Sequence, residues 1–388
     1  MEKLQKERVC ACALGRIFGF EPRYIVKFIE ALGSAEAVFD LTRDELDGLL
    51  GPGSRYSRRI GRKALDESAE ELERLAGRGW TFVACTEEAF PRELRSCEDS
   101  PAGLYTLGVS RPEDIFNRRP GIAVVGTRDV SPYGREWTAR IVEAISQAPS
   151  KPVIVSGLAF GVDICAHLAA LDSGIPTIAV LPTGPDRIYP VSHTAAAERI
   201  RHSEGCALVS DYPPGTCPAA NTFLRRNRII AGLAGATVLT ESKIRGGGLI
   251  TCRLAAGYGR EVFVLPGRID DLRSQGCNLL LREKTAEPIT DIRLLGEQLG
   301  LGSYNLRRKA DLTEKVRSFY SSAGNPRTEE LCAMAELVRL KRGADVEELA
   351  GACGKSYSEA AGLLGTLESD RFIDMDLLQR CTINIKNV

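Results

Sequence analysis

The sequence predicts an α/β protein: an extended Rossmann-like domain with a doubly wound, mostly parallel sheet, between an all-helical N-terminal domain and a winged-helix-like C-terminal domain. Three observations support this. Apolar residues recur at helical spacing through residues 1–78. Between residues 79 and 303, short apolar runs alternate with helix-length segments, which is typical of βα repeats. Residues 304–388 return to a mainly helical pattern that ends in a short apolar run. We therefore expect three domains with these boundaries.

Composition agrees with a globular protein of several domains. The chain has 388 residues, of which 44% are hydrophobic and 26% charged, and a single hydrophobic core rarely supports this length. No apolar run approaches the roughly 20 residues that a membrane span requires. The N-terminal segment also lacks the apolar core and cleavage pattern of a signal peptide. We expect a cytoplasmic protein that does not bind membranes.

Cysteine and charge usage restrict the possible ligands. Twelve cysteines occur without a CxxC pair, and the chain has three histidines, so we expect reduced thiols, no bound metal and no cofactor. Basic and acidic residues balance at 51 each, which argues against nonspecific coating of nucleic acid. A polyanion site must therefore be local. Residues 221–282 carry ten Lys and Arg against four Asp and Glu.

The N-terminal region has the pattern of a small helical bundle. Apolar spacing and short breakers predict helices at residues 3–18, 22–32, 35–39, 43–50 and 56–76. The turn Gly51-Pro52-Gly53 and the arginines after it resemble the glycine turn of helix-hairpin-helix DNA-binding units. A SAM-like bundle with a plain helix connection is the alternative.

The middle region supplies the strands. The apolar runs GIAVVG, PVIVSG, TIAVLP, ALVS, ATVLTE and EVFVLPG occur in this order between residues 121 and 267. They predict parallel strands that are buried on both faces by helices. The segments WTFVAC and GLYTLG, within residues 79–108, predict a pair of strands that leads into this sheet.

The C-terminal region predicts the order of elements in a winged helix. A helix at residues 311–322 is followed by a polar stretch containing Gly and Pro, then by Asp345 as an N-cap. Helices at 346–352 and 358–369 flank a turn, and a strand follows at 372–374. The second helix of this pair carries no Lys or Arg. We therefore expect it to contact protein or to be structural, rather than to enter a DNA groove.

The segment NTFLRRNRIIAGLAG, residues 221–235, places Arg225, Arg226 and Arg228 in the first turns of a predicted helix. Cations are disfavoured there, because exposed amides and the macrodipole favour anions by about 0.3–1 kcal/mol per charge. A negative group is therefore expected beside the arginines. It is either a phosphate ligand, with Phe223 offering a face to a base, or an Asp or Glu elsewhere in the fold.

Glycine-rich loops follow three of the predicted strands. Gly126-Thr127-Arg128 follows the first, SGLAFGVD (156–163) follows the second, and SKIRGGG (242–248) opens a helix after ATVLTE. Open parallel sheets bind ligands beyond the carboxyl ends of their strands, where the strand order reverses. Glycines let a backbone approach a phosphate closely. We therefore expect a pocket at this edge, with Gly247 and Gly248 at a helix N-terminus that binds phosphate.

The common nucleotide motifs are missing. The turn after the first strand reads GTRDVSPYG rather than GxGxxG, no acidic residue closes the second strand, and no Walker A loop occurs. Asp163 and His167 are interpreted as a helix cap and a partly buried packing residue, because no catalytic triad assembles at convincing spacing. Glu241 is the best carboxylate for acid–base chemistry, and it is equally suited to anchoring Arg128 or Arg225. We do not expect an enzyme.

The loop motifs follow one another in a characteristic order. Between about residues 100 and 285 they read GTRDVSPYGRE, SGLAFGVDICAH, LPTGPDRIYP, SDYPPGT, NTFLRRNRIIAGLA, GGGLITCRLA, GREVFVLPG and RSQGCNLL. In order and spacing they closely resemble the DprA family, also called Smf, of bacterial DNA-processing proteins. The resemblance implies an extended Rossmann fold that binds and protects incoming single-stranded DNA and forms a homodimer. It also implies loading of the recombinase RecA onto strands covered by single-strand-binding protein, during natural transformation.

The resemblance further implies which residues meet DNA. Family contacts cluster in a positive pocket at the carboxyl edge of the sheet, and in this chain they fall on Arg128, Phe223, Arg225, Arg226, Asn227, Arg228, Gly247 and Gly248. The residues that we expect to shape the pocket are Gly126, Thr127, Ser156, Gly157, Gly161, Glu241 and Arg245. The chain departs from the family pattern at Leu224, where proline is common, at Gly246, where serine is frequent, and at residues 283–285.

Two alternatives from other classes remain open. A nucleotide-binding hydrolase with a Rossmann-like fold would use Glu241 beside the GGG loop, and it predicts release of phosphoribosyl groups from nucleotides. A sensor would bind a small nucleotide in the Rossmann-like domain and would bind duplex DNA through the C-terminal region. The lack of basic residues on the second helix of that region counts against the sensor.

Overall fold

The structure is a computed structural model that describes residues 2–19, 21–302, 312–322, 324–341, 344–376 and 379–383. As described, the chain forms two compact units, Met1–Tyr304 and Asn305–Val388. The expected domain boundary between residues 303 and 304 and the expected helix start at Asp311 lie outside the described residues.

The N-terminal region is helical at each of the expected places. It contains α1 (Glu2–Phe18), α2 (Arg23–Leu32), α3 (Ala35–Phe39), α4 (Arg43–Leu50), the 3₁₀ turn η1 (Ser57–Arg59) and α5 (Arg62–Ala76). Side chains cap two of these helices. The Ser34 hydroxyl accepts a hydrogen bond from the Ala37 amide at the start of α3, and Thr42 and Glu45 form a reciprocal capping box at the start of α4. The expected helix 56–76 is divided into η1 and α5.

The first unit is built on a sheet that has nine strands in the described residues, in the order β1-β2-β6-β5-β4-β3-β7-β8-β9. The strands are β1 (Thr81–Ala84), β2 (Gly103–Leu107), β3 (Gly121–Val125), β4 (Val153–Ser156), β5 (Thr177–Val180), β6 (Ala207–Ser210), β7 (Ala236–Leu239), β8 (Glu261–Val264) and β9 (Glu287–Pro288). Pairing is antiparallel for β1 with β2 and for β2 with β6, and parallel elsewhere. The predicted Rossmann-like sheet is thus confirmed, and β9 is an addition too short to leave a sequence pattern.

Strand order reverses at β3. From β3 the chain steps outward through β4 and β5 to β6, and it then crosses to β7 and β8 on the other side. In the register, Ala123 of β3 pairs with Val155 of β4, and Val124 of β3 pairs with Val238 of β7. The carboxyl ends of β3, β4 and β7 therefore meet at one edge of the sheet, which is where open parallel sheets bind ligands.

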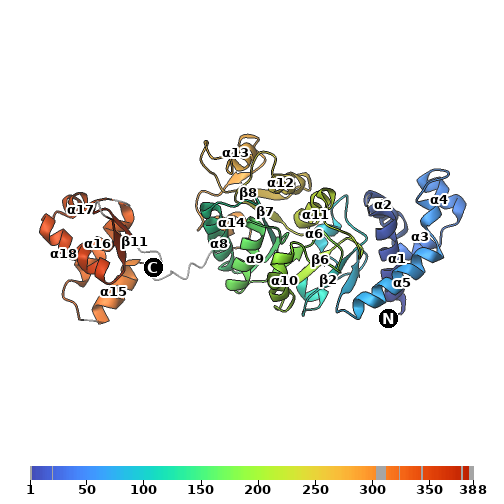
Figure 1. The fold of residues 1–388 in the computed structure, drawn as a ribbon, viewed down its shortest axis with the longest axis horizontal. Coiled ribbons are helices and arrows are strands. Elements are labelled where there is room, and N and C mark those ends of the chain that lie inside the picture. The colour runs from blue at the N-terminus through green and yellow to red at the C-terminus, as the bar shows by residue number, and fades with distance from the viewer. Residues whose placement is uncertain are drawn as a thin grey trace. The chain divides into compact units, whose positions relative to one another are not determined.

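Helices cover both faces of the sheet (Figure 1). The first face packs against α11 (Ala220–Gly232), α12 (Gly247–Gly257) and α13 (Gln275–Arg282). The second packs against α8 (Pro132–Ser146), α9 (Val162–Asp172), α10 (Thr194–Arg201) and α14 (Leu295–Gln298). Alternation along β3 follows the pleat, because Ala123 and Val125 join the first cluster whereas Ile122 and Val124 join the second. The connections contain α6 (Arg92–Arg95), α7 (Pro112–Ile115) and the 3₁₀ turn η2 (Val191–His193).

The N-terminal helices share a hydrophobic cluster with the sheet. Phe18 of α1 packs in the same cluster as Phe82 of β1 and is fully buried. A buried polar contact joins the same elements, because the Tyr105 hydroxyl of β2 donates to Glu71 of α5 at 2.5 Å. Residues 1–78 therefore belong to one compact unit with the sheet, and the boundary expected at residue 78 does not separate two units.

The second unit, as far as it is described, contains α15 (Leu312–Ser322), α16 (Thr328–Leu340), α17 (Val346–Cys353), α18 (Tyr357–Ser369), β10 (Ile373–Met375) and β11 (Cys381–Ile383). Asp345 caps α17 as expected, in a reciprocal capping box with Glu348. Helix α16 is missing from the expected elements, although Leu331, Ala335 and Val338 recur at helical spacing and are buried. The assignment of this unit as a winged helix stays a prediction.

Within the described ranges, none of the helices combines the length and the apolar character that crossing a bilayer requires. No three His, Cys, Asp or Glu side chains in those ranges lie close enough together to hold a metal ion. All twelve cysteines fall in the described ranges and are free thiols.

His167 on α9 ties this helix to β4 and β5, and it is fully buried where partial burial was expected. Its Nε2 accepts from the Leu158 amide at 3.2 Å, and its Nδ1 lies 2.7 Å from the Thr177 hydroxyl. That hydroxyl donates to the Ile154 carbonyl at 2.8 Å, so the ring must donate from Nδ1 and remain neutral. Burial, and secondarily the charge of Arg226, lowers the pKa of His167 to about 3.

Stability should therefore fall on mild acidification. His167 has a pKa of about 3 in the folded chain and 6.5 as its ordinary value, so the unfolded chain binds the extra proton. The stabilisation is present above pH 6.5 and is lost as the pH falls toward 3. We expect the free energy of unfolding, measured with urea, to drop by about 1 kcal/mol between pH 7 and pH 5.5. His167→Gln should abolish this dependence, whereas His202→Gln, at an exposed histidine, should retain it. An unchanged slope in His167→Gln would assign the titration to another group.

Candidate functional site

A groove of about 730 Å³ lies at the edge of the sheet where the strand order reverses. Its walls come from the turn after β3, the loops after β4, β5 and β7, and the first turns of α11 and α12. The expected site residues that line it are Gly126, Thr127, Arg128, Phe223, Arg226, Asn227, Arg245, Gly247 and Gly248. Segments more than 100 residues apart in sequence therefore meet in one concavity.

Two glycine segments bring backbone against backbone at the bottom of the groove. A Cβ added to Gly248 would lie 2.9 Å from the Gly126 Cα, and a Cβ added to Gly126 would lie 2.8 Å from the Glu241 carbonyl oxygen. The Thr127 amide donates to that carbonyl at 2.7 Å. Neither glycine leaves room for a side chain, and α12 therefore begins directly against the turn after β3.

The N-terminus of α12 is available to an anion. Its N-cap is Gly246, and among the described residues no side chain caps the helix. The first amides of a helix lack intrahelical partners, and together with the macrodipole they favour a negative ligand. Gly246, Gly247 and Gly248 all line the groove, and Gly247 is exposed. The Gly246 amide already donates to the Lys243 carbonyl at 2.9 Å, so the first turn of α12, beginning at the exposed Gly247, is the part that is open to a phosphate.

Arg128 and Phe223 form a platform on the groove wall. The guanidinium carbon of Arg128 lies 4.4 Å from the centroid of the Phe223 ring. Tyr189 packs edge-on against the same ring, with centroids 5.5 Å apart. Arg128 is exposed and Phe223 is half-buried. The ring face holds the guanidinium in place by cation–π attraction and leaves its N–H groups for a ligand.

The loop after β7 adds further positive charge to the groove. Arg245 is exposed and has no ion pair within the described part of the chain. Lys243 Nζ lies 3.7 Å from Asp129 Oδ2, which Arg273 also contacts at 2.9 Å. One exposed carboxylate thus serves two cations, and this wall of the groove keeps an excess of positive charge.

Arg226 lies in the floor of the groove and is only 3% exposed. It donates to the Gly157 carbonyl at 2.6 Å and to the carbonyl of Val180. Burial lowers the pKa of Arg226 to about 10, and the attraction of Asp163 opposes that shift. The arginine therefore stays charged at neutral pH. Burial raises the pKa of Asp163. Its carboxylate accepts from the Gly157 amide at 3.1 Å, so Asp163 stabilises the loop before α9 instead of capping the helix.

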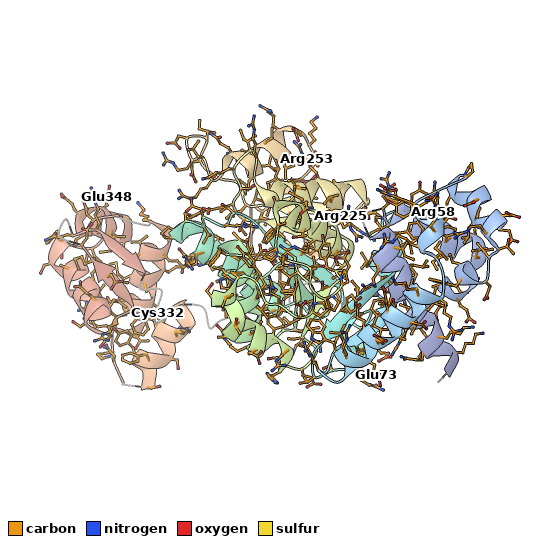
Figure 2. All side chains as sticks on the ribbon, turned by 45° about the vertical axis from the view of Figure 1, so that its right-hand side comes forward. Arg58, Glu73, Arg225, Arg253, Cys332 and Glu348 are labelled. Carbon is orange, nitrogen blue, oxygen red and sulfur yellow. The ribbon has the colours of Figure 1, made fainter. Side chains whose placement is uncertain are left out.

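The three arginines of α11 do not converge on one ligand, and the expectation that all three face the pocket is wrong. Arg228 is buried and pairs with the Asp211 carboxylate. Arg225 donates to the Gly19 carbonyl, on the side of the N-terminal helices (Figure 2). Successive residues of a helix point about 100° apart, so Arg226 faces the groove while Arg225 and Arg228, three residues apart, share another face. For Arg228, the negative group expected beside the arginines is internal.

Glu241 neither faces the groove nor anchors Arg128 or Arg225, so both interpretations of this carboxylate are wrong. It is 1% exposed. Its Oε2 accepts from the Ser131 amide at 2.9 Å, its other oxygen accepts from the Ser131 hydroxyl, and Gly134 packs directly over it. The carboxylate thus stabilises the N-terminus of α8. The hydrolase alternative loses the residue on which it depends.

Ser156, Gly157 and Gly161 lie behind the groove wall. The Ser156 hydroxyl donates to a carbonyl of β3 at 2.7 Å. A Cβ added to Gly157 would lie 2.5 Å from the Arg226 guanidinium. Gly161 has a φ of 77°, and a Cβ there would lie 2.2 Å from the Thr127 carbonyl oxygen. These residues leave the space that the groove floor and the turn after β3 occupy.

The sequence model of the family described as DNA recombination-mediator protein A matches residues 81–300, which is more than half of the chain. The chain belongs to the DprA family. The matched span contains all nine strands of the first unit's sheet, as described, and every segment that lines the groove. The resemblance drawn from the loop motifs is thereby confirmed.

Several DprA relatives match the chain in sequence. It is 33% identical over 270 residues to the putative DNA processing protein DprA of Mycobacterium tuberculosis, which covers 66% of each chain. It is 39% identical over 197 residues to the DNA processing protein DprA of Streptococcus pneumoniae, covering 51% of this chain and 67% of the relative. The match to the Mycobacterium protein thus spans slightly less than two thirds of that protein's length.

Solved DprA structures share the fold. The X-ray structure of DNA processing protein A from Streptococcus pneumoniae matches with a TM-score of 0.58 and 29% identity, covering 76% of this chain and 96% of that one. A structure of DNA processing protein A from Helicobacter pylori, titled for its single-stranded DNA binding mode, matches with a TM-score of 0.50 and 29% identity. It covers 57% of this chain and 95% of that one.

The groove of this DprA protein also contains residues that were not singled out from the sequence. Tyr189, Lys243 and Asp129 line it. Tyr189 occurs in the LPTGPDRIYP motif that follows β5, and Lys243 stands two residues before Arg245. Applying the rule on strand ends to every parallel strand, and to every charge in each loop, identifies all three.

The two kinds of arginine should differ in their effect on stability. Arg228→Ala should lower the free energy of unfolding by about 3–5 kcal/mol, because it leaves the buried Asp211 carboxylate without its counterion. The exposed Arg245→Ala should change it by less than about 0.5 kcal/mol. Chemical denaturation of both variants measures the difference. Equal stabilities would mean that the buried pair contributes nothing to the fold.

Proposed function

We propose that this DprA protein binds single-stranded DNA in the groove. The observation that carries the proposal is the Arg128–Phe223 platform beside the uncapped N-terminus of α12. A base can stack on this platform of guanidinium and ring, while its phosphate meets helix amides within the same concavity. The Helicobacter pylori relative, whose structure is titled for single-stranded DNA binding, supports the same ligand class.

The chemistry of the groove favours a strand over a duplex. Its cations, Arg128, Lys243 and Arg245, hold phosphates without reading a base sequence. Phe223 contributes only if a base is free to leave its neighbours and lie against the ring. The bases of a duplex are already stacked and paired inside the helix. Binding is therefore expected to prefer single strands and to tolerate any sequence.

We further propose that the protein acts as a recombination mediator rather than an enzyme. It would protect incoming single-stranded DNA in the cytoplasm and load RecA onto strands covered by single-strand-binding protein during natural transformation. We propose a homodimer as the working form. Support for this role comes from the description of the family as recombination mediators. Glu241, the carboxylate that a hydrolase would use, is instead buried and accepts from the Ser131 amide.

Strand binding should depend on Phe223 and on groove cations. With a single-stranded oligonucleotide of about 16 nucleotides, Phe223→Ala should weaken binding by about 1–3 kcal/mol through the lost stacking. Arg245→Ala should flatten the salt dependence by about 0.7 in logarithmic slope, the value for one phosphate contact on a single strand. Arg74→Ala, which removes an exposed arginine of α5, is the charge-matched control and should leave both quantities unchanged. Fluorescence anisotropy at two salt concentrations measures them.

The duplex of the same sequence completes this test. We expect it to bind much more weakly than the single strand at both salt concentrations. Equal affinity for strand and duplex, or full affinity in Phe223→Ala, would show that bases do not enter the groove.

Loading of RecA should require a groove that binds DNA. On strands covered by single-strand-binding protein, the wild-type protein should shorten the lag before RecA-dependent ATP hydrolysis begins. Phe223→Ala should lose this acceleration in step with its lost affinity, and Arg74→Ala should keep it. If the wild-type protein leaves the lag unchanged while it binds single strands tightly, mediation is wrong and binding stands.

A further inference from the structure

A second concavity lies beside the groove, between the N-terminal helices and α11. We call it the α2–α11 cleft, and its volume is about 550 Å³. Its walls are the start of α2, the first turns of α11 and one residue of α12, and its lining includes Arg23, Lys27, Leu224 and Arg225. Figure 2 labels Arg225 at this border between the sheet and the N-terminal helices. All of these segments belong to the first compact unit.

Basic residues dominate the lining of the cleft. It contains four arginines and lysines and two carboxylates, Glu21 and Asp99. Both carboxylates are engaged, because Glu21 contacts Arg55 at 3.1 Å and the Tyr258 hydroxyl donates to Asp99 at 2.7 Å. Lys27 is exposed and has no ion pair or side-chain hydrogen bond within the described residues. Arg23 is also exposed and forms an ion pair with Glu98 at 2.5 Å, and Arg228 is paired with Asp211. An exposed pair such as Arg23–Glu98 contributes little stability, so Arg23 can exchange it for a phosphate, and Lys27 already presents its charge to solvent.

One wall of the cleft contains an unsatisfied buried donor. Arg228 lines the cleft and is 6% exposed. Its Nε is buried and has no hydrogen-bond partner among the described residues, although its terminal nitrogens donate to Asp211 and to the Asp99 carbonyl. A buried N–H without a partner costs free energy. Because this Nε is buried, a ligand in the cleft does not reach it, and Arg228 contributes charge to the cleft wall rather than a direct contact.

The cleft and the groove are adjacent and meet at Leu224. This residue lines both concavities and is 48% exposed. The residue before it, Phe223, lines the groove, and the residue after it, Arg225, lines the cleft. Consecutive residues of the first turn of α11 thus lead from the stacking platform, across an apolar step, to a second set of cations.

We propose that the single strand continues from the groove across Leu224 into the α2–α11 cleft. There its next phosphates lie against Arg23 and Lys27 of α2. This inference rests on the proposed binding of single-stranded DNA, and it assigns to the N-terminal helices a direct part in that binding. The ligand is the phosphodiester backbone of the same strand, so the cleft contributes only when the strand is long enough to reach it.

The test compares two double variants on oligonucleotides of two lengths. Arg23→Ala/Lys27→Ala removes the two exposed cations of the cleft, and Arg62→Ala/Lys63→Ala removes the same residue types from the exposed start of α5. Lengths of about 5 and about 16 nucleotides lie near the two ends of the range of single-strand site sizes. Affinity is measured for each at low and high salt by fluorescence anisotropy, after thermal melting has checked the fold.

We expect the cleft variant to bind the short oligonucleotide like wild type and the long one more weakly. Loss of two phosphate contacts should reduce the logarithmic salt slope by about 1.4. When salt rises from about 50 to about 200 mM, the affinity of the wild-type protein for the long oligonucleotide should therefore fall about sevenfold further than that of the variant. The α5 variant should match wild type at both lengths. Lys27→Gln removes no ion pair or hydrogen bond of the described residues, and it should show half the change in salt slope. This single variant keeps the test valid if the double variant has a lowered melting temperature.

Two outcomes separate this inference from the proposed function. An unchanged slope for the long oligonucleotide in the cleft variant, with tight binding by wild type, would overturn the cleft and leave the groove intact. Failure of wild type to bind either oligonucleotide would overturn the proposed function itself. Equal weakening of both lengths would place Arg23 and Lys27 in the groove site and would also contradict a path that reaches them last.

Discussion

The reversal of strand order at β3 is the constraint on which the rest of the structure depends. Because β4 and β7 flank β3 in parallel, the turn after β3 and the glycine loop after β7 must share one edge. Backbone can meet backbone there only without side chains, as the fit of Gly248 against Gly126 shows. The same contact aims the uncapped N-terminus of α12 into the groove. An anion site therefore follows from topology, and the basic residues around it add to a field that the backbone already provides.

Helix α11 shows how one short basic segment can serve fold and surface together. Arg228 forms a buried ion pair with Asp211, and Arg226 donates hydrogen bonds to backbone carbonyls in the groove floor. These charges cannot move toward a ligand, because their hydrogen-bonding groups are already directed by the fold. Arg226 still contributes a fixed positive potential beneath the groove, weakened by Asp163. Arg128 and Arg245 are exposed and line the groove, so fewer arginines are accessible to a ligand there than the density of arginines in the sequence suggests.

The sequence was sufficient for the sheet and for the location of the groove, because both follow from local patterns. Apolar runs bounded by breakers mark buried strands, and glycines after strands mark the edge where ligands bind. The directions in which individual side chains point could not be predicted from the sequence. Whether Arg225 or Arg226 faces the groove depends on the rotation of α11 about its axis. Glu241 accepts a hydrogen bond from Ser131, which is 110 residues away in sequence. Helix α16 is not among the predicted elements, although its apolar residues recur at helical spacing directly after the polar stretch around residues 324–327.

The position of the N-terminal helices is set by packing rather than by a linker. Phe18 and Phe82 belong to one buried cluster, and the Glu71–Tyr105 hydrogen bond joins α5 to β2 inside it. Moving α2 away from α11 would expose that cluster, so the width of the cleft between them is part of the folded state. Cations held at a fixed spacing lose less entropy when a strand binds than cations on a mobile arm do. A helical region that looks in sequence like an independent domain thus forms one wall of the α2–α11 cleft.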